Sequence, residues 1–347
     1  MDRYKSFFRG IAYAGYCIVF LFAVYTFEKS IPDQIYVKAG EAIDYQFQVP
    51  VTMEIQEDSS PVAKSTNNAN VRQSYIVTCR LFGIFPVKDI EVVLVDGDAV
   101  YAGGMPIGIY VKTSGVLVIG TSEVERPDGS EAAPAENILK AGDYILSVNG
   151  EKVAEKEDLQ RLVQQNGAEK EILKINRKGE EVEVGVTPVQ NKNGTYMLGA
   201  WVRDDLAGIG TLTYYKEDGT YGALGHAVSD GDVGERIQMS EGYVYNAQII
   251  GVKKGQKGNP GELSGMIRYQ SADCLGTIEE NTDIGIYGKL DGNIAALPRG
   301  DYYNICYKQD IKQGPATIIC GFTGEKKEYA IEIESLDYSG REANKGI

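Results

Sequence analysis

The stretch Leu139–Gly150, LKAGDYILSVNG, decides the fold of the central part of the chain. Together with the residues just before it (APAENILKAGD), its first half reads as a short helical stretch with a glycine near the end. Its second half, YILSVNG, is a strand that runs into an Asn-Gly pair, the typical turn of a two-residue β-hairpin. The stretch therefore predicts a helical segment, a strand and a hairpin in immediate succession.

The residues that follow continue the pattern. EKEDLQRLVQQNG, residues 155–167, places Leu159, Leu162 and Val163 on one helical face and stops at a glycine. EKEILKINRKGEEVEVGVTP, residues 169–188, predicts two alternating strands around Arg-Lys-Gly. An amphipathic helix is thus expected to pack against a small antiparallel sheet.

Upstream, PIGIYVKTSGVLVIG (residues 106–120) predicts a pair of apolar strands punctuated by glycine. With this pair in front, the order of elements over residues 101–190 resembles a PDZ domain. The sequence L-x-A-G-D-x-I-L-S-V-N-G is typical of bacterial members of that family.

The resemblance implies peptide capture. An extended peptide would add a strand beside Gly108–Lys112 and lie against the helix at Lys156–Gln165. Backbone N–H groups of a loop at Ile107, Gly108 and Ile109 would receive the terminal carboxylate of the peptide. The alternative is a groove that is filled within the molecule or serves only as a packing surface.

The regions on either side are rich in β-structure. Residues 31–100 predict a small β module, and residues 191–347 predict many short strands between Gly and Asp turns, as in a barrel or sandwich. The expected fold class is therefore mainly β, with an α+β PDZ domain in the middle.

The N-terminus predicts a membrane anchor within residues 1–30. Arg3, Lys5 and Arg9 precede an uncharged apolar run, Gly10–Phe27. At about 1.5 Å per residue, this run approaches the ~30 Å thickness of a bilayer core. The basic flank places the N-terminus in the cytoplasm and the bulk of the chain outside it. The alternative is a cleaved signal peptide, but no A-x-A-like site follows the run.

Composition excludes several classes of function. The net charge of −14 argues against a nucleic-acid partner, because a phosphate backbone requires basic patches. One histidine and five cysteines without a C-x-x-C spacing argue against zinc, so neither a metal nor a cofactor is expected. A cross-strand disulfide between Cys306 and Cys320 is an open alternative to free thiols.

The one histidine, His226, lies in YGALGHAVSD, residues 221–230. Small neighbours leave room beside its ring, so it is a candidate general base or a residue packed at a turn. A base requires a nucleophile within reach, and Ser229, Ser264 and Ser339 all lack a convincing context. A cysteine nucleophile among Cys274, Cys306 and Cys320 is a weaker alternative. Asp230 and Asp232 suit a cation site or a solvated turn.

The full arrangement resembles the stage IV sporulation protein B (SpoIVB) serine peptidases. The resemblance rests on the anchor, the PDZ motif, and the sequences TYGALGHAVSD, GNPGELSG, DYSG and NKG. It implies a trypsin-like peptidase domain over residues 191–347 with His226 as the general base. The family's acidic residue and its G-x-S-G-S-P nucleophile motif have no counterpart in the chain, so this domain is expected to be incomplete at its C-terminal end.

The resemblance also implies a role. Such peptidases act in the intermembrane space of the forespore, where they cleave themselves and then a membrane-bound inhibitor of an intramembrane metalloprotease. This cleavage triggers the processing of pro-sigma-K. The expected partners are thus protein substrates, including the chain itself, and the membrane. The alternative function is a non-catalytic, membrane-tethered PDZ scaffold or an inactive peptidase remnant.

Overall fold

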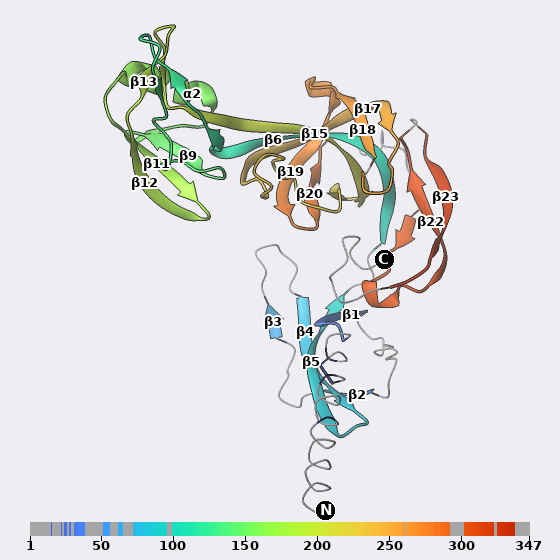
Figure 1. The fold of residues 1–347 in the computed structure, drawn as a ribbon. Helices are drawn as coiled ribbons and strands as arrows, with labels where there is room; N and C mark the ends of the chain where they lie inside the picture. The colour runs from blue at the N-terminus through green and yellow to red at the C-terminus, as the bar shows by residue number, and fades with distance from the viewer. Residues whose placement is uncertain are drawn as a thin grey trace, which may run out of the picture. The chain divides into compact units, whose positions relative to one another are not determined.

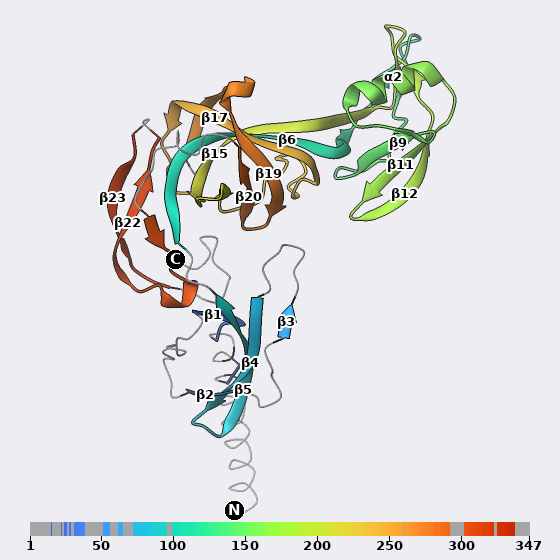
Figure 2. The ribbon, with the colours of Figure 1, turned by 180° about the vertical axis from the view of Figure 1, so that it is seen from behind.

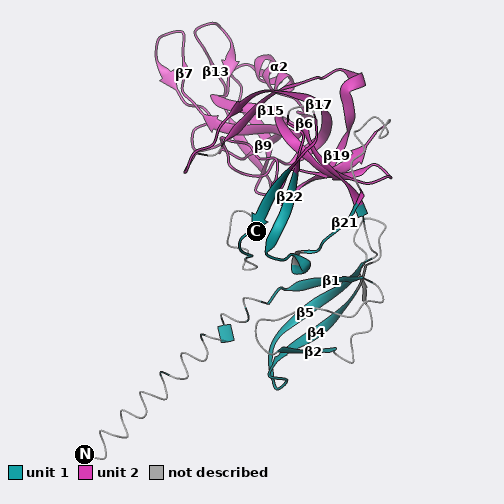
Figure 3. Cartoon of the chain, turned by 90° about the vertical axis from the view of Figure 1, so that its right-hand side faces the viewer, with its two compact units in different colours: residues 1–99, 303–318, 329–347 teal, residues 100–302, 319–328 magenta. Residues whose placement is uncertain are grey.

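The computed structural model describes residues 31–38, 51–55, 62–64, 72–95, 99–259, 261–291, 302–322 and 325–336, and a few isolated positions before residue 31. The chain divides into two compact units, coloured separately in Figure 3. The first comprises residues 1–99, 303–318 and 329–347, and the second comprises residues 100–302 and 319–328.

The first unit is built on a five-stranded sheet in the order β1-β5-β4-β2, with β3 paired to β4. The strands are β1 (Gln34–Lys38), β2 (Val51–Ile55), β3 (Val62–Lys64), β4 (Arg72–Leu81) and β5 (Phe85–Val95). Strand β1 pairs with β5 in parallel, and the other pairs are antiparallel. Ile35, Val77, Ile90 and Val92 form the centre of its core.

The second unit contains a twelve-stranded sheet. Its elements begin with β6 (Ala99–Thr121), β7 (Val124–Glu125), β8 (Glu131–Ala132), β9 (Tyr144–Val148), β10 (Glu151–Lys152), α2 (Lys156–Asn166), β11 (Glu171–Arg177) and β12 (Glu180–Val186). They continue with β13 (Val189–Gln190), β14 (Tyr196–Met197), β15 (Ala200–Tyr215), β16 (Thr220–Ala223), β17 (Met239–Lys253), β18 (Glu262–Ile267), the 3-10 helix η1 (Ser271–Asp273), β19 (Cys274–Thr282) and β20 (Gly285–Leu290).

The remaining described elements lie towards the C-terminus. They are β21 (Tyr302–Asn304), the 3-10 helix η3 (Lys308–Asp310), β22 (Gly314–Cys320) and β23 (Lys327–Ile333). Among the described strands, β22 and β23 pair with each other alone. The prediction of a mainly β chain is thus confirmed.

The PDZ-like part follows the local pattern of its sequence in its helix α2 and its hairpin, but residues 134–142, predicted as a helical stretch, form turns. Helix α2 buries Leu159, Leu162 and Val163, as its periodicity predicts. Asn149 and Gly150 adopt positive φ between β9 and β10, which confirms the hairpin turn. These residues enclose a core with β9, β11 and the C-terminal end of β6.

The upstream segment differs from its prediction. Residues 99–121 form one strand of 23 residues, β6, instead of a pair of strands. Its first half pairs with β15 and β17, and its second half pairs with β15 and β9. The partner changes at Gly115, which has a φ of +94° and lies against the Ile145 carbonyl. Glycine therefore marks a change of neighbour here, not the end of a strand.

Strands β6 and β15 both run from the PDZ-like part into a second β layer built from β16 to β20 (Figures 1 and 2). The core of that layer contains Leu212, Tyr215 and Tyr221, which are fully buried. The two parts of the second unit therefore share their longest strands.

No helix among the described residues is long and apolar enough to cross a membrane. The predicted span, Gly10–Phe27, lies almost entirely outside the described residues, as does Cys17.

Candidate active site and peptide groove

His226 lies on an exposed loop directly after β16. Strand β16 is fixed between β15 and β20, so the start of this loop is held by the sheet. Leu224, with a φ of +65°, turns the chain out of the strand, and Gly225 follows without a side chain. The imidazole is therefore presented to solvent at the end of a strand.

The hydrogen bond of the ring selects its neutral tautomer. His226 Nδ1 lies 2.8 Å from the Ala227 carbonyl oxygen. Because a carbonyl oxygen only accepts, Nδ1 of the neutral ring must carry the proton, which leaves a lone pair on Nε2. This is the form that a general base requires.

Side chains distant in sequence hold the loop. The Leu224 N–H donates to the Thr211 carbonyl at 3.0 Å, and the Thr213 hydroxyl donates to the Leu224 carbonyl at 3.1 Å. On the other side of the histidine, Asn281 accepts from the Val228 N–H at 2.8 Å and donates to the Val228 and Ile237 carbonyls. The segment around His226 is thus anchored on both sides.

Asp230 closes the same loop. Its carboxylate is buried, accepts from the backbone N–H groups of Asp232 and Val233, and is bound by Arg203 from β15. Arg203 also lies 3.2 Å from Asp232. The turn expected to be solvated or to hold a cation is instead an ion-paired structural anchor.

Within the described residues, none of the candidate serines is hydrogen-bonded to His226. Ser229 is exposed in a bridge to Arg236, Ser264 lies in β18 opposite Gly251, and Ser339 lies outside the described residues. Cys306 and Cys320 are free thiols, so the disulfide alternative is not realised. Across the described part of the chain, the one hydrogen bond of the imidazole is to its own loop.

The predicted carboxylate loop has a different place in the structure. Ile107, Gly108 and Ile109 lie inside β6, paired with β15 on one edge and with β17 on the other. Ile107 and Ile109 are buried in the core. Their backbone groups are used within the sheet, so this segment offers no free edge to a peptide.

A free edge exists on β15. Residues Ala200–Asp205 pair with β6 on one side, and none of the described strands pairs with their other side. A groove of about 620 Å³ runs there against α2, lined by apolar residues that include Leu159, Val163, Leu198 and Val202. An extended peptide fits such an edge by adding a strand.

Two features shape this groove. Gly199 turns the chain into β15 with a φ of +69°, and a Cβ there would lie 2.7 Å from the Ser122 carbonyl. Asp204 holds the start of α2, because it accepts from the Lys156 backbone N–H at 2.8 Å and from its Nζ at 2.9 Å. Burial opposes the charge on Asp204, but the Lys156 hydrogen bonds outweigh it and hold the pKa of that carboxyl below its usual value.

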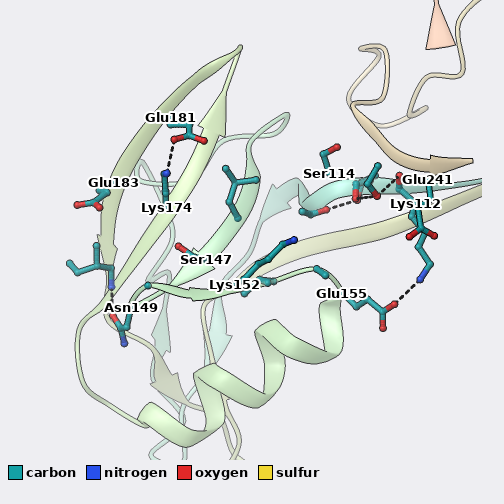
Figure 4. A pocket seen from close by; sticks show the side chains of 18 residues that line it. Lys112, Ser114, Ser147, Asn149, Lys152, Glu155, Lys174, Glu181, Glu183 and Glu241 are labelled. Carbon is teal, nitrogen blue, oxygen red and sulfur yellow. Dashed lines mark hydrogen bonds and ion pairs between the residues drawn. The ribbon is translucent and has the colours of Figure 1, made fainter. Parts of the chain in front are cut away.

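A larger cavity of about 1120 Å³ lies between β9 to β12 and the β6–β17 pair (Figure 4). Its charges neutralise one another: Lys112 pairs with Glu155 at 2.8 Å, and Lys174 pairs with Glu181 at 2.6 Å. With both signs present, the cavity has no clear selectivity for a cation or an anion.

Comparison with known proteins identifies both parts. Residues 194–347 match the family model described as SpoIVB peptidase S55, and residues 127–177 match that of the PDZ domain. Over residues 194–347, the chain belongs to the SpoIVB peptidase family. The family indicates a serine protease, which acts on protein substrates, and the second match adds a PDZ domain.

Solved structures give a partial likeness. The PDZ domain of an SdrC-like protein from Listeria monocytogenes is 18% identical, covers 26% of this SpoIVB peptidase and is itself covered over 87% of its length, with a TM-score of 0.22. No curated protein gives a significant match.

Proposed function

We propose that this SpoIVB peptidase is a membrane-anchored serine endopeptidase with His226 as its general base. The observation that carries the proposal is the exposed imidazole, whose Nδ1 lies against the Ala227 carbonyl and whose Nε2 has no hydrogen-bond partner among the described residues. The family membership of this segment supports the same role.

The chemistry is acyl transfer. His226 Nε2 takes the proton of a serine hydroxyl as that oxygen attacks the substrate carbonyl, and then returns it to the leaving amine. The Ala227 carbonyl orients the ring and stabilises the imidazolium formed on the way, a role that a carboxylate fills in other triads. The nucleophile and the oxyanion donors are not assigned to residues of this chain.

The PDZ groove supplies the substrate. A peptide that adds to Ala200–Asp205 lies on the strand that continues into the sheet beneath His226. Peptides that include segments of the chain itself suit this edge, because strand addition uses backbone hydrogen bonds and tolerates varied side chains.

The apolar N-terminal run supports the proposed location, and the family resemblance supports the proposed role. The apolar run Gly10–Phe27 with its basic flank supports an anchor that leaves the peptidase outside the cytoplasm. In that setting, the proposed reactions are self-cleavage and cleavage of a membrane-bound inhibitor, which starts pro-sigma-K processing.

Self-cleavage tests the proposal. The chain, extended by a segment that carries the family's acidic residue and G-x-S-G-S-P motif, is expressed in membranes and followed by gel electrophoresis, with its native residues, with His226→Ala and with the loop control Ser229→Ala. The native chain and S229A are expected to be cleaved and to react with a fluorophosphonate probe, whereas H226A is expected to do neither. Equal cleavage of H226A and the native chain removes His226 from the mechanism.

The second candidate is a non-catalytic PDZ scaffold. It is favoured by one observation: within the described residues, no serine is hydrogen-bonded to the imidazole. A scaffold predicts no probe labelling in any variant, together with peptide binding that H226A leaves unchanged.

A further inference from the structure

Two adjacent residues of β15 hold the two functional elements of the second unit. Arg203 binds Asp230 and Asp232 in the loop that carries His226. Asp204 binds both nitrogens of Lys156 at the start of α2, the wall of the groove. The residue that holds the His226 loop and the residue that holds the groove wall are therefore consecutive in β15.

The register of β15 explains how neighbours reach different elements. Arg203 lies opposite Leu117, and Asp205 lies opposite Lys112, so the pairing with β6 breaks at Asp204. An irregularity of this kind redirects side chains and is a point at which a strand can bend. The Asp204 carbonyl accepts from the Thr113 hydroxyl at 3.0 Å, which satisfies the backbone at the break.

Arg203 is the cation that allows Asp230 to be buried. The Asp230 side chain is fully buried, whereas that of Arg203 is 34% exposed. A buried carboxylate that loses its cation is strongly unfavourable, so the loop would have to move to expose it. The hydrogen bonds from Asp232 and Val233 to Asp230 would be lost in that movement.

We propose that Arg203 is a positioning residue for His226 and that, through Asp204, it links the α2 wall of the peptide groove to the base. A displacement of α2 moves Asp204 through its hydrogen bonds to Lys156. The adjacent Arg203 then moves with the strand and displaces Asp230. The inference rests on the proposed roles of His226 and of the groove.

The single histidine allows a direct test. The full chain is labelled with ¹³C,¹⁵N-histidine, so that all imidazole signals come from His226. Arg203→Gln is expected to move these signals towards the position of an unfolded chain, and Arg203→Lys, which keeps the charge but loses the planar fork, is expected to move them less. The control Arg80→Gln, which removes an arginine paired with Glu54 in the first unit, is expected to leave them in place. Unmoved signals in R203Q, or in R203K where R203Q fails to fold, overturn the positioning role.

A double-mutant comparison tests the link. Asp204→Asn weakens the hold on α2 without touching the histidine loop, and it is expected to shift the His226 signals in the native chain but not in the R203Q background. Unshifted signals in D204N overturn the link. Neither measurement reads cleavage, so a failure here is separate from a failure of the proposed peptidase, which H226A tests.

Discussion

The PDZ-like part and the loop that carries His226 each contain a buried aspartate that is paired with an arginine. In the first, the carboxylate of Asp143 is buried and bound by Arg177 at 2.8 and 2.6 Å. In the second, the carboxylate of Asp230 is buried and bound by Arg203. Asp143 fixes the corner between a helical turn and β9, inside the packed core of its own motif. Asp230 fixes a surface loop. The comparison teaches that one kind of buried ion pair serves folding in one place and presentation of a side chain in the other.

The largest expected effect comes from removing each arginine in turn. Arg177→Gln and Arg203→Gln each leave a buried carboxylate without its cation, which costs about 3 kcal/mol or more of local stability. Hydrogen exchange measured segment by segment should rise over residues 139–150 in R177Q and over residues 224–237 in R203Q. An identical exchange pattern in the two variants would show that the two pairs belong to one cooperative unit and would break the comparison.

A smaller effect is expected at Asn281. Asn281→Ala removes three hydrogen bonds to Val228 and Ile237, and the loss should be about 2 kcal/mol because the part-buried Val228 N–H loses its acceptor. Exchange should rise around His226 while the PDZ-like part stays protected. Asn246→Ala, which removes a 3.4 Å contact with Asp273, is the matched control. Faster exchange in both variants would contradict a specific role for Asn281.

These anchors also show what the sequence can reveal. The Asn149–Gly150 turn and the buried face of α2 depend on neighbours within one or two turns of chain, so their patterns predicted them correctly. Arg203 meets Asp230 across 27 residues, and Asn281 meets Val228 across 53. No periodicity or spacing signals such pairs.

The groove was misplaced for a related reason. The apolar residues of PIGIYV fit a PDZ strand, but a strand alone does not reveal its partners, and β15 and β17 occupy both edges. The free edge at Ala200–Asp205 lies after the helix in sequence. The PDZ pattern predicts an end near residue 190, so it does not point to this edge.

Glu171 provides a contrast to both aspartates, because it is fully buried and neither carboxylate oxygen is satisfied by a hydrogen bond. Burial raises the pKa of this carboxyl, so the folded state keeps its proton to a higher pH than the unfolded state does. The stability of the folded state is therefore highest below about pH 4.3, the pKa of a glutamate carboxyl in the unfolded chain. It falls as the pH rises through the pKa that this carboxyl has in the folded chain. Glu171→Gln should remove this loss and stabilise the PDZ-like part by about 1 kcal/mol at neutral pH. Urea unfolding of both proteins at pH 4 and pH 8 checks it, and an equal difference at the two pH values would contradict the explanation.

The smallest effect is expected where the pair is exposed. Lys112 on β6 pairs with Glu155 just before α2 at 2.8 Å, with side chains 36% and 54% exposed. The hydrogen bond that Lys112 donates to Glu155 raises the pKa of Lys112, so the lysine stays charged across the physiological range. Water and salt screen this pair, so Lys112→Gln should cost less than about 1 kcal/mol, and the cost should vanish near 1 M salt.

Asp204→Asn weakens the interaction of the buried Asp204 carboxylate with the same end of α2. The cost of this change should persist at high salt, because a buried pair is screened far less. Hydrogen exchange of α2, measured at low and at high salt, distinguishes the Lys112–Glu155 pair from the Asp204–Lys156 pair. If both variants lose their effect in salt, Asp204 is no firmer an anchor for the groove than Lys112, and the link from α2 to His226 loses its physical basis.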